Sequence, residues 1–258
     1  MPPILFEIKN DIAHISLNRP ERLNSFNREM ALLLQQRLDE ANSDSSVRCV
    51  VITGSGKAFC AGQDLLEVAD PHGPGMEKIL VEHFNPVIMK IRNLAKPVVA
   101  FVNGVAAGAG ANIALCCDIV IAATSASFIQ AFSKIGLVPD SSGTYFLPRL
   151  IGFQKASALM MLGEKVTALE AEQMGMAYKV FPDDTFEQEA LKIAETLATM
   201  PTRGLALIKT ALNKSFTQTL EEQLSTEDDL QQQAASTNDF KEGVRAFIEK
   251  RRPEFSGN

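Results

Sequence analysis

The sequence lacks any apolar run near the roughly 18 consecutive residues that a membrane-spanning helix needs, so we expect no membrane partner. It also lacks an excess of basic residues. Lys and Arg number 25 against 31 Asp and Glu, and the net charge of −6 disfavours nucleic acid as a partner. The first residues have neither the basic and apolar regions of a secretory signal nor the Arg- and Ser-rich character of a transit peptide. These absences favour a cytoplasmic protein.

Histidine and cysteine are scarce, with three and four residues, and neither is arranged for catalysis or metal binding. His14 lies in a strand-like pattern, His72 in a loop with Pro and Gly, and His83 in a helical segment, so no Ser-His-Asp arrangement is indicated. The cysteines lie in apolar runs without metal-ligand spacing, typical of buried thiols in a reducing compartment: Cys49, Cys60, Cys116 and Cys117. We expect no metal site.

The first two-thirds of the chain alternates between strand and helix patterns. Residues 4–9 and 12–17 are strand-like and are separated by Asn10-Asp11, a pair typical of a hairpin turn. Residues 26–41 carry apolar side chains at helical spacing and predict a helix with one covered face. The continuous apolar runs typical of strands buried on both faces are 49–52, 98–102 and 119–123. This alternation predicts an α/β core.

From Thr185 onward the patterns are helical only. Thr219 and Glu222 form the capping-box pattern that opens one helix, and residues 240–251 predict the last. Few apolar residues lie between 226 and 240, so this region cannot form a core of its own. We expect it to pack on another surface, such as a second subunit.

Two loops rich in Gly and Ala each follow a buried strand, at residues 55–64 and 103–112. Neither contains GxGxxG or a Walker lysine, which disfavours a nucleotide loop. Small residues at a helix start leave backbone N–H groups free, and two such loops are what an oxyanion hole built from backbone donors needs. A strand-to-helix turn in the first loop and close helix–strand packing in the second remain the alternatives.

A third stretch, residues 136–144, carries an isolated acid, Asp140, between Pro and Ser-Ser. One interpretation is a helix N-cap, which Asp favours. The other is a carboxylate set among Phe132, Leu137 and Val138, whose pKa rises enough for proton exchange near neutral pH. The residues alone leave both open.

In combination, these three stretches resemble the enoyl-CoA hydratase/isomerase, or crotonase, superfamily, and the likeness continues to residues 246–255. The resemblance implies an α/β fold, a ClpP-like spiral of ββα units with a C-terminal helical trimerisation region. It implies an acyl-CoA-binding core at 1–195 and an oligomerisation region at 196–258. It further implies a homotrimer or a dimer of trimers.

The resemblance also implies the site. The family holds the thioester oxygen with two backbone N–H groups, which correspond by position to Gln63 and Ala109. Lys57 and Lys250 are candidates for the coenzyme A phosphates, although both could equally be solvated surface charges. The residues expected to contact coenzyme A are Lys57, Ala61, Gly62, Gln63, Asp64, Leu65, Gly108 and Lys250.

The sequence departs from the hydratase branch at the catalytic step. A typical hydratase of the family has two glutamates that activate water, and the corresponding positions hold Asn112 and Phe132. Asp140 falls where the double-bond isomerases place their acid. Residues 136–150 look especially like the ring-opening epoxyphenylacetyl-CoA isomerases of phenylacetate catabolism, with Ser142 where that group more usually has Gly.

The resemblance therefore implies an acyl-CoA isomerase that shifts a double bond or rearranges a ring epoxide, with Asp140 as acid and base. Such proton transfer needs no metal or redox cofactor, since coenzyme A is part of the substrate. The alternatives are an enoyl-CoA hydratase of fatty-acid or aromatic catabolism, a related hydrolase, and a non-catalytic acyl-CoA-binding protein.

Overall fold

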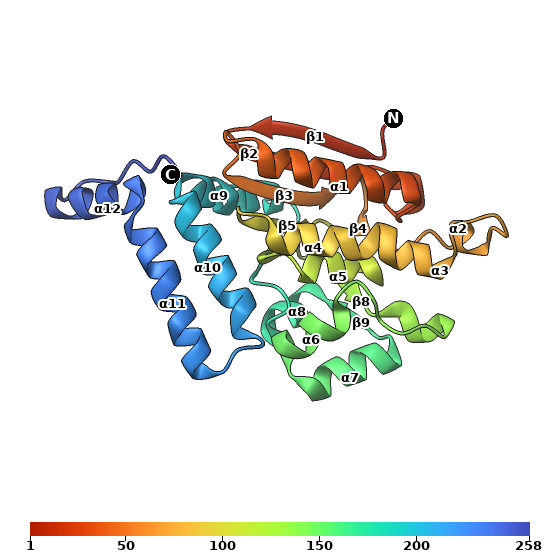
Figure 1. The fold of residues 1–258 in the computed structure, drawn as a ribbon. Helices are drawn as coiled ribbons and strands as arrows, with labels where there is room; N and C mark the ends of the chain where they lie inside the picture. Colours follow the sequence, from red (N-terminus) through yellow and green to blue (C-terminus); the bar gives the residue numbers. More distant parts are fainter.

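The computed structural model describes residues 1–258, and it contains two β-sheets surrounded by helices (Figure 1). The larger sheet has the order β1-β2-β3-β5-β7-β10. Its strands are β1 (Ile4–Lys9), β2 (Ile12–Leu17), β3 (Cys49–Gly54), β5 (Val98–Val102), β7 (Ile119–Ala123) and β10 (Lys179–Phe181). Only the β1–β2 hairpin is antiparallel. The predicted hairpin, the three buried strands and the α/β class are confirmed.

Asn10 and Asp11, with φ of 51° and 61°, make the turn of that hairpin. Two-residue hairpin turns need a positive φ, which Asn and Asp tolerate better than most residues. In β5 every residue is buried, because α9 packs on the strand as do β4 and α5. The continuous apolar run in the sequence reflects this double coverage.

The smaller sheet positions the site, and it was not expected from the sequence. Its strands are β4 (Ala58–Cys60), β6 (Val105–Ala107), β8 (Ser127–Ile129) and β9 (Lys165–Thr167), in that order. The first three run parallel, so their carboxyl ends lie at one edge. Three-residue strands are too short to show a period of two, which is why the pattern did not predict them.

Twelve α-helices complete the fold. They are α1 (Arg28–Ser43), α2 (Leu65–Ala69), α3 (Gly75–Lys78), α4 (Asn85–Asn93), α5 (Ala109–Leu115), α6 (Gly143–Ile151), α7 (Phe153–Leu162), α8 (Ala168–Met174), α9 (Phe186–Thr199), α10 (Thr202–Ser215), α11 (Leu220–Ala235) and α12 (Asn238–Glu249). Three further turns are η1 (Pro20–Arg22), the π-helical η2 (Ile79–Phe84) and η3 (Ala131–Ile135). None of these helices combines the length and apolar character required to span a membrane.

The chain after Thr185 is entirely helical, as predicted, and the capping box of Thr219 and Glu222 opens α11. The predicted division between residues 195 and 196 falls inside α9, which packs on β2, β3, β5, β7 and β10. The tail after α12 returns to the core, where Arg48 donates to the carbonyl oxygens of Phe255 and Met200.

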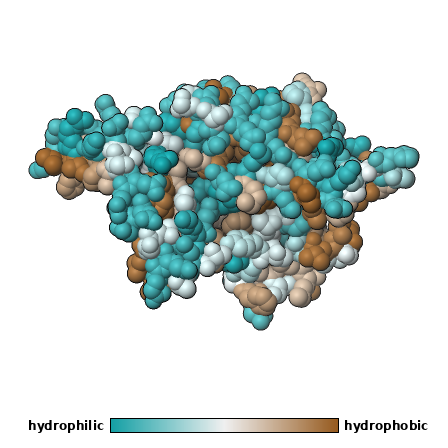
Figure 2. Space-filling model, in the orientation of Figure 1, coloured by the Kyte–Doolittle hydropathy of each residue, from teal (hydrophilic) through white to brown (hydrophobic).

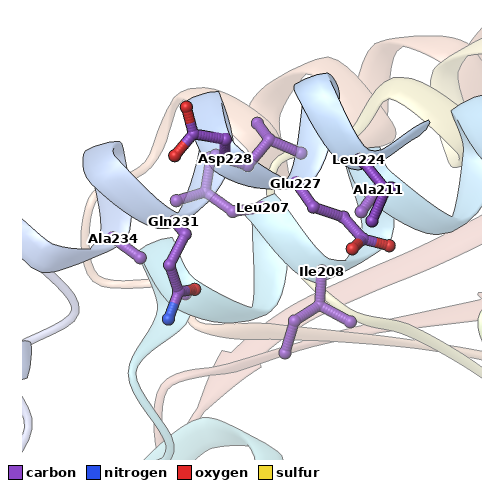
Figure 3. A pocket seen from close by; sticks show the side chains of 10 residues that line it. Leu207, Ile208, Ala211, Leu224, Glu227, Asp228, Gln231 and Ala234 are labelled. Carbon is purple, nitrogen blue, oxygen red and sulfur yellow. The ribbon is translucent and has the colours of Figure 1, made fainter. Parts of the chain in front are cut away.

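The C-terminal helices present apolar surface to solvent. Figure 3 shows the groove between α10 and α11, a cavity of about 630 Å³ whose apolar walls include Leu207, Ile208 and Leu224. On α12, Phe247 and Ile248 are 85% and 73% exposed, and the projecting end of this helix carries hydrophobic surface in Figure 2. Apolar faces of this extent are typical of surfaces that bind a partner.

Gly110, in the first turn of α5, lets that helix pack directly on β4. A Cβ added there would lie 2.4 Å from Cys60 O and 2.7 Å from Cys60 Sγ. We expect Gly110→Ala to lower the free energy of unfolding by about 1–3 kcal/mol, since overpacking forces neighbouring groups to shift. Urea unfolding at a fixed protein concentration measures the effect.

Gly204→Ala is the matched control, because the added Cβ would be 3.5 Å from Pro201 Cγ, an ordinary contact in α10. Helix propensity predicts a gain of roughly 0.5–1 kcal/mol there. A Gly110→Ala variant as stable as the parent would contradict the packing argument.

Candidate active site

The first loop of the site follows β4 and is held by Phe26. The Phe26 N–H donates to Gly62 O at 2.7 Å, and the Asp64 N–H donates to Phe26 O at 2.8 Å. In extended chain, successive N–H groups point to opposite sides. The Gln63 N–H therefore points away from Phe26.

The second loop follows β6 and lies against the first. A Cβ on Gly62 would lie 2.9 Å from Ala107 O and 3.3 Å from Ala109 N, so the two main chains are in contact. Gly62 and Gly108 have φ of 91° and 53°, a region that glycine adopts without strain. The structure thus brings Gln63 and Ala109 to neighbouring positions at one sheet edge, as two backbone donors for one oxygen would require.

Side chains around the first loop make hydrogen bonds that hold the loop in place. Asp64 accepts from Arg19 Nη2 at 2.9 Å and from the Leu66 N–H at 3.1 Å, where it caps α2. Gln63 Nε2 donates to Glu67 Oε2 at 2.8 Å. The other oxygen of Glu67 accepts from the backbone N–H of Arg28 at 2.9 Å. Both carboxylates are therefore occupied by structural partners.

Asp140 is different, because one hydrogen bond alone reaches its carboxylate. Ser141 Oγ donates to Oδ1 at 2.8 Å. The alternative interpretation of Asp140 as a helix cap is wrong, since α6 begins at Gly143 and no side chain caps it. Burial raises the pKa of Asp140, and the Ser141 hydrogen bond opposes that rise. Oδ2 has no hydrogen-bond partner within the chain.

The main chain of Asp140 is tied to α5 by a buried amide. Asn112 Nδ2 donates to Asp140 O at 2.8 Å, and Gln130 Nε2 donates to Asn112 Oδ1 at 2.8 Å. Asn112 lies one turn after Ala109 in α5, so Asp140 is attached close to the second loop, which we call the Gly-rich loop (residues 103–112). Gln130 follows the end of β8, the third parallel strand of the smaller sheet.

The expected apolar setting of Asp140 is only partly present. Phe132 is buried, and its ring lies over the Gly-rich loop, with Cζ 3.9 Å from the Cβ position of Gly108. Leu137 and Val138 are 38% and 77% exposed, so the expectation that they enclose the carboxylate is wrong for the single chain. Both residues follow η3, which ends at Gly136 in a left-handed conformation.

Comparison with known proteins identifies the family of this chain. The family model "Enoyl-CoA hydratase/isomerase" matches residues 7–258. The chain belongs to this family. A 1,2-epoxyphenylacetyl-CoA isomerase of Escherichia coli (strain K12) is 48% identical over 257 residues, covering 98% of each chain. A Rhodobacter capsulatus protein named "Probable enoyl-CoA hydratase" is 43% identical, again over 98% of each chain.

Solved structures of the enoyl-CoA hydratase/isomerase family confirm the predicted crotonase-type fold. An enoyl-CoA hydratase from Bacillus anthracis superposes with a TM-score of 0.93 at 34% identity, covering 99% of this chain and 100% of the other. Relatives named as isomerases and as hydratases therefore share this fold, and the fold does not distinguish the two reactions.

The remaining residues that the family resemblance assigns to coenzyme A form two sets. Ala61, Gly62, Asp64 and Gly108 belong to the two loops in contact, and the exposed Leu65 follows the first. The exposed Lys57 precedes β4 and lies beside Gly104 at the amino end of the strands, so the structure does not bring it to the edge that carries the loops. Lys250 is the C-cap of α12 and is also exposed. Figure 1 places α12 and α2 at opposite edges of the molecule, so Lys250 is not brought to these loops within one chain.

Sequence reasoning missed Ser141, Gln130 and the contact that Asn112 makes with Asp140. Asn112 was noticed only as a replacement for a glutamate. Gln130 has no local signal, because the fold brings it to Asn112, 18 residues away. Ser141 is adjacent to Asp140, but the sequence does not show that its hydroxyl turns toward the carboxylate. The Asn112 and Asp140 positions are 28 residues apart.

We expect Ser141→Ala to raise the pKa of Asp140 further. Burial already disfavours the ionised carboxylate, and the Ser141 hydroxyl stabilises that form, so its removal leaves burial unopposed. The protonated form then persists to higher pH. Infrared titration of the protonated carboxyl band, with Asp140→Asn as the reference for subtraction, measures the shift.

Ser142→Ala is the matched control. Ser142 has a similar positive φ, but its hydroxyl donates to Ser141 O rather than to the carboxylate. The pKa of Asp140 should stay near the parental value in this variant. An unchanged or lowered pKa in Ser141→Ala would show that the hydroxyl does not stabilise the carboxylate.

Proposed function

We propose that the protein is an acyl-CoA isomerase that shifts a double bond or rearranges a ring epoxide, with Asp140 as the proton carrier. One observation carries the proposal. Asp140 presents a carboxylate oxygen without a partner on a turn that is bonded to α5, close to the Gly-rich loop, whereas Asp64 and Glu67 are committed to structural hydrogen bonds. A raised pKa suits an acid that must take up a proton and return it.

The proposed reaction starts with the thioester carbonyl between the N–H groups of Gln63 and Ala109. Asp140 removes a proton from the acyl chain, and the electron pair moves toward the carbonyl to give an enolate. The two N–H groups stabilise its oxygen; removing one such donor typically costs about 2.7–4 kcal/mol. Protonated Asp140 then returns the proton at another carbon, so the product has the mass of the substrate.

Two features disfavour the hydratase alternative. The Asn112 amide is bound on both sides, by Asp140 O and by Gln130, and has no carboxylate to activate water. Phe132 fills the other position with a buried ring over the Gly-rich loop. An apolar ring at that position excludes water from the space above the loop. The hydrolase alternative lacks the same water-activating base.

The substrate class follows from the same argument. A 3-enoyl thioester loses an acidic proton next to the carbonyl. In a ring epoxide, the electron pair of the enolate forms a carbon–carbon double bond while the epoxide C–O bond breaks, and the alkoxide that leaves takes up the proton from Asp140. The likeness to the 1,2-epoxyphenylacetyl-CoA isomerase, at 48% identity over nearly the whole chain, favours the epoxide. We therefore propose an acyl-CoA that carries a ring epoxide, as in phenylacetate catabolism, ahead of a linear one.

We expect Asp140→Asn to lower turnover by about 10²–10⁴-fold, the usual contribution of a general acid–base group. The side chain keeps its size and can still accept from Ser141, so thioester binding and melting temperature should change little. Rates are measured on epoxyphenylacetyl-CoA and 3-enoyl-CoA, with deuterium uptake from heavy water followed by mass spectrometry. Asp183→Asn, a change at an exposed residue bound to Ser125, is the matched control.

The products separate the alternatives. Near-normal turnover in Asp140→Asn would remove Asp140 from the mechanism. Rapid conversion of 2-enoyl-CoA to a 3-hydroxyacyl product, heavier by one water, would establish the hydratase. Tight thioester binding with no turnover and no proton exchange on any of the three substrates would favour the non-catalytic binding protein.

We also propose a homotrimer or a dimer of trimers, assembled through the C-terminal helices. The exposed apolar side chains of α12 and the groove between α10 and α11 supply the surface. Such an assembly would also give Lys250 a route to the coenzyme A site of a neighbouring subunit, which it lacks within its own chain.

Sedimentation at micromolar concentration tests the assembly. We expect a trimer or twice that mass for the parent, and a smaller species for the double variant Phe247→Glu and Ile248→Glu, because charge disfavours burial in an interface. A monomeric parent would contradict the proposal. A double variant that sediments like the parent would exclude this face of α12 from the interface.

A further inference from the structure

The side-chain amides of Gln130 and Asn112 are buried and are hydrogen-bonded in series to Asp140 O. Only one orientation of each amide allows both hydrogen bonds. Both side chains are nearly inaccessible, at 1% and 2% exposure. Asp140 O can only accept, so Asn112 must turn Nδ2 toward it and Oδ1 toward Gln130. Gln130 then supplies Nε2 to Oδ1. Flipping either amide would set two acceptors or two donors against each other.

The main chain of the turn that these two amides hold is strained. Ser141 and Ser142, directly after Asp140, have φ of 49° and 66°, a left-handed conformation that costs energy for residues other than glycine. Such a conformation persists only where the surroundings impose it. Asp140 O accepts both the Gly143 N–H at 2.9 Å and Asn112 Nδ2 at 2.8 Å.

Gly143 shows how closely the amide is fitted to this turn. A Cβ at that position would lie 2.3 Å from Asn112 Nδ2 and 2.7 Å from its Cγ. The Asn112 side chain therefore packs directly against the main chain of the turn as well as bonding to it. Little room remains for the turn to shift while the amide is in place.

We infer that Asn112, oriented by Gln130, is a positioning residue that sets the direction of the Asp140 carboxylate; this inference rests on the function proposed above. The hydrogen bond fixes the carbonyl end of Asp140, and Ser141 fixes Oδ1. Together they leave Oδ2 as the one oxygen free to face the acyl chain. Asn112 does not itself touch the reacting atoms.

This role predicts an effect on turnover rather than on binding. The donors assigned to the thioester are backbone N–H groups of Gln63 and Ala109, and neither depends on the Asn112 amide. Losing the hold on Asp140 should displace the proton carrier while the thioester stays in place. A misplacement on the order of 1 Å can cost about 10²-fold in rate.

Asn112→Asp is the main test, because it keeps the shape and the acceptor for Gln130 but loses the donor to Asp140 O. We expect kcat to fall by about 10- to 100-fold with KM nearly unchanged. Rates are taken on the pH-independent plateau at high pH. The introduced carboxyl group is ionised there and cannot donate to Asp140 O, and its effect on the pKa of Asp140 no longer changes the rate. Gln130→Met, which leaves Asn112 in place without its partner, should give a smaller fall in kcat.

Gln35→Glu is the matched control. Gln35 also donates through its side-chain amide to main chain, at Glu82 O (2.7 Å) and His83 O (3.2 Å), but it lies outside the two loops and makes no contact with Asp140. We expect a melting temperature lowered as in Asn112→Asp, with a parental kcat. Recording both melting temperatures separates lost stability from lost positioning.

Three outcomes would overturn the inference: a parental kcat in Asn112→Asp, an equal fall in Gln35→Glu, or a rise in KM with kcat unchanged. Asp140→Asn serves as the reference for the proposed function. If Asp140→Asn is inactive while Asn112→Asp is normal, the positioning role fails and the proposed function stands. If Asp140→Asn is active, the proposed function fails whatever Asn112 does.

Discussion

The main chain at Gly62 passes so close to Ala107 and Ala109 that a single added methyl group would not fit. Parallel pairing of β4 with β6 brings the two loops to the same edge, and Gly110 lets α5 approach β4 to the same degree. Two main chains can approach one another this closely only where the residues in contact have small side chains or none. The small residues in both loops are therefore a geometric requirement of the site.

Asp140 depends on a second constraint, built from side chains. Its turn has no regular secondary structure of its own, and two consecutive residues in it are left-handed. Hydrogen bonds from Asn112 and Gly143 to a single carbonyl oxygen offset the strain. A carboxylate on a turn held in this way loses little entropy when a substrate binds, because its direction is already limited.

How far the sequence predicts this site depends on the range of the interactions. The hairpin, the buried strands and the capping box at Thr219 follow from patterns within a few residues, and the structure has them where expected. The interpretation of Asp140 as a helix cap is wrong because the conformation there depends on a long-range contact. Pro-Asp-Ser-Ser reads locally as a cap, but the contact with Asn112, 28 residues away, accompanies a turn that delays α6 to Gly143. The family resemblance likewise assigns Lys250 to the coenzyme A site, but within a single chain Lys250 lies at the opposite edge of the molecule from that site.

The position of Asn112 also bears on why one fold would carry two reactions. The resemblance to the family puts a water-activating glutamate of the hydratases at this position, and a carboxylate there could not donate to Asp140 O. Two carboxylates so close would also repel one another, and one would stay protonated. An amide at 112 removes the repulsion and supplies the missing donor at once. An acid at position 140 and an acid at position 112 would therefore be alternatives. A glutamate at 112 activates water in the hydratases, whereas the amide of Asn112 would hold the turn that carries Asp140.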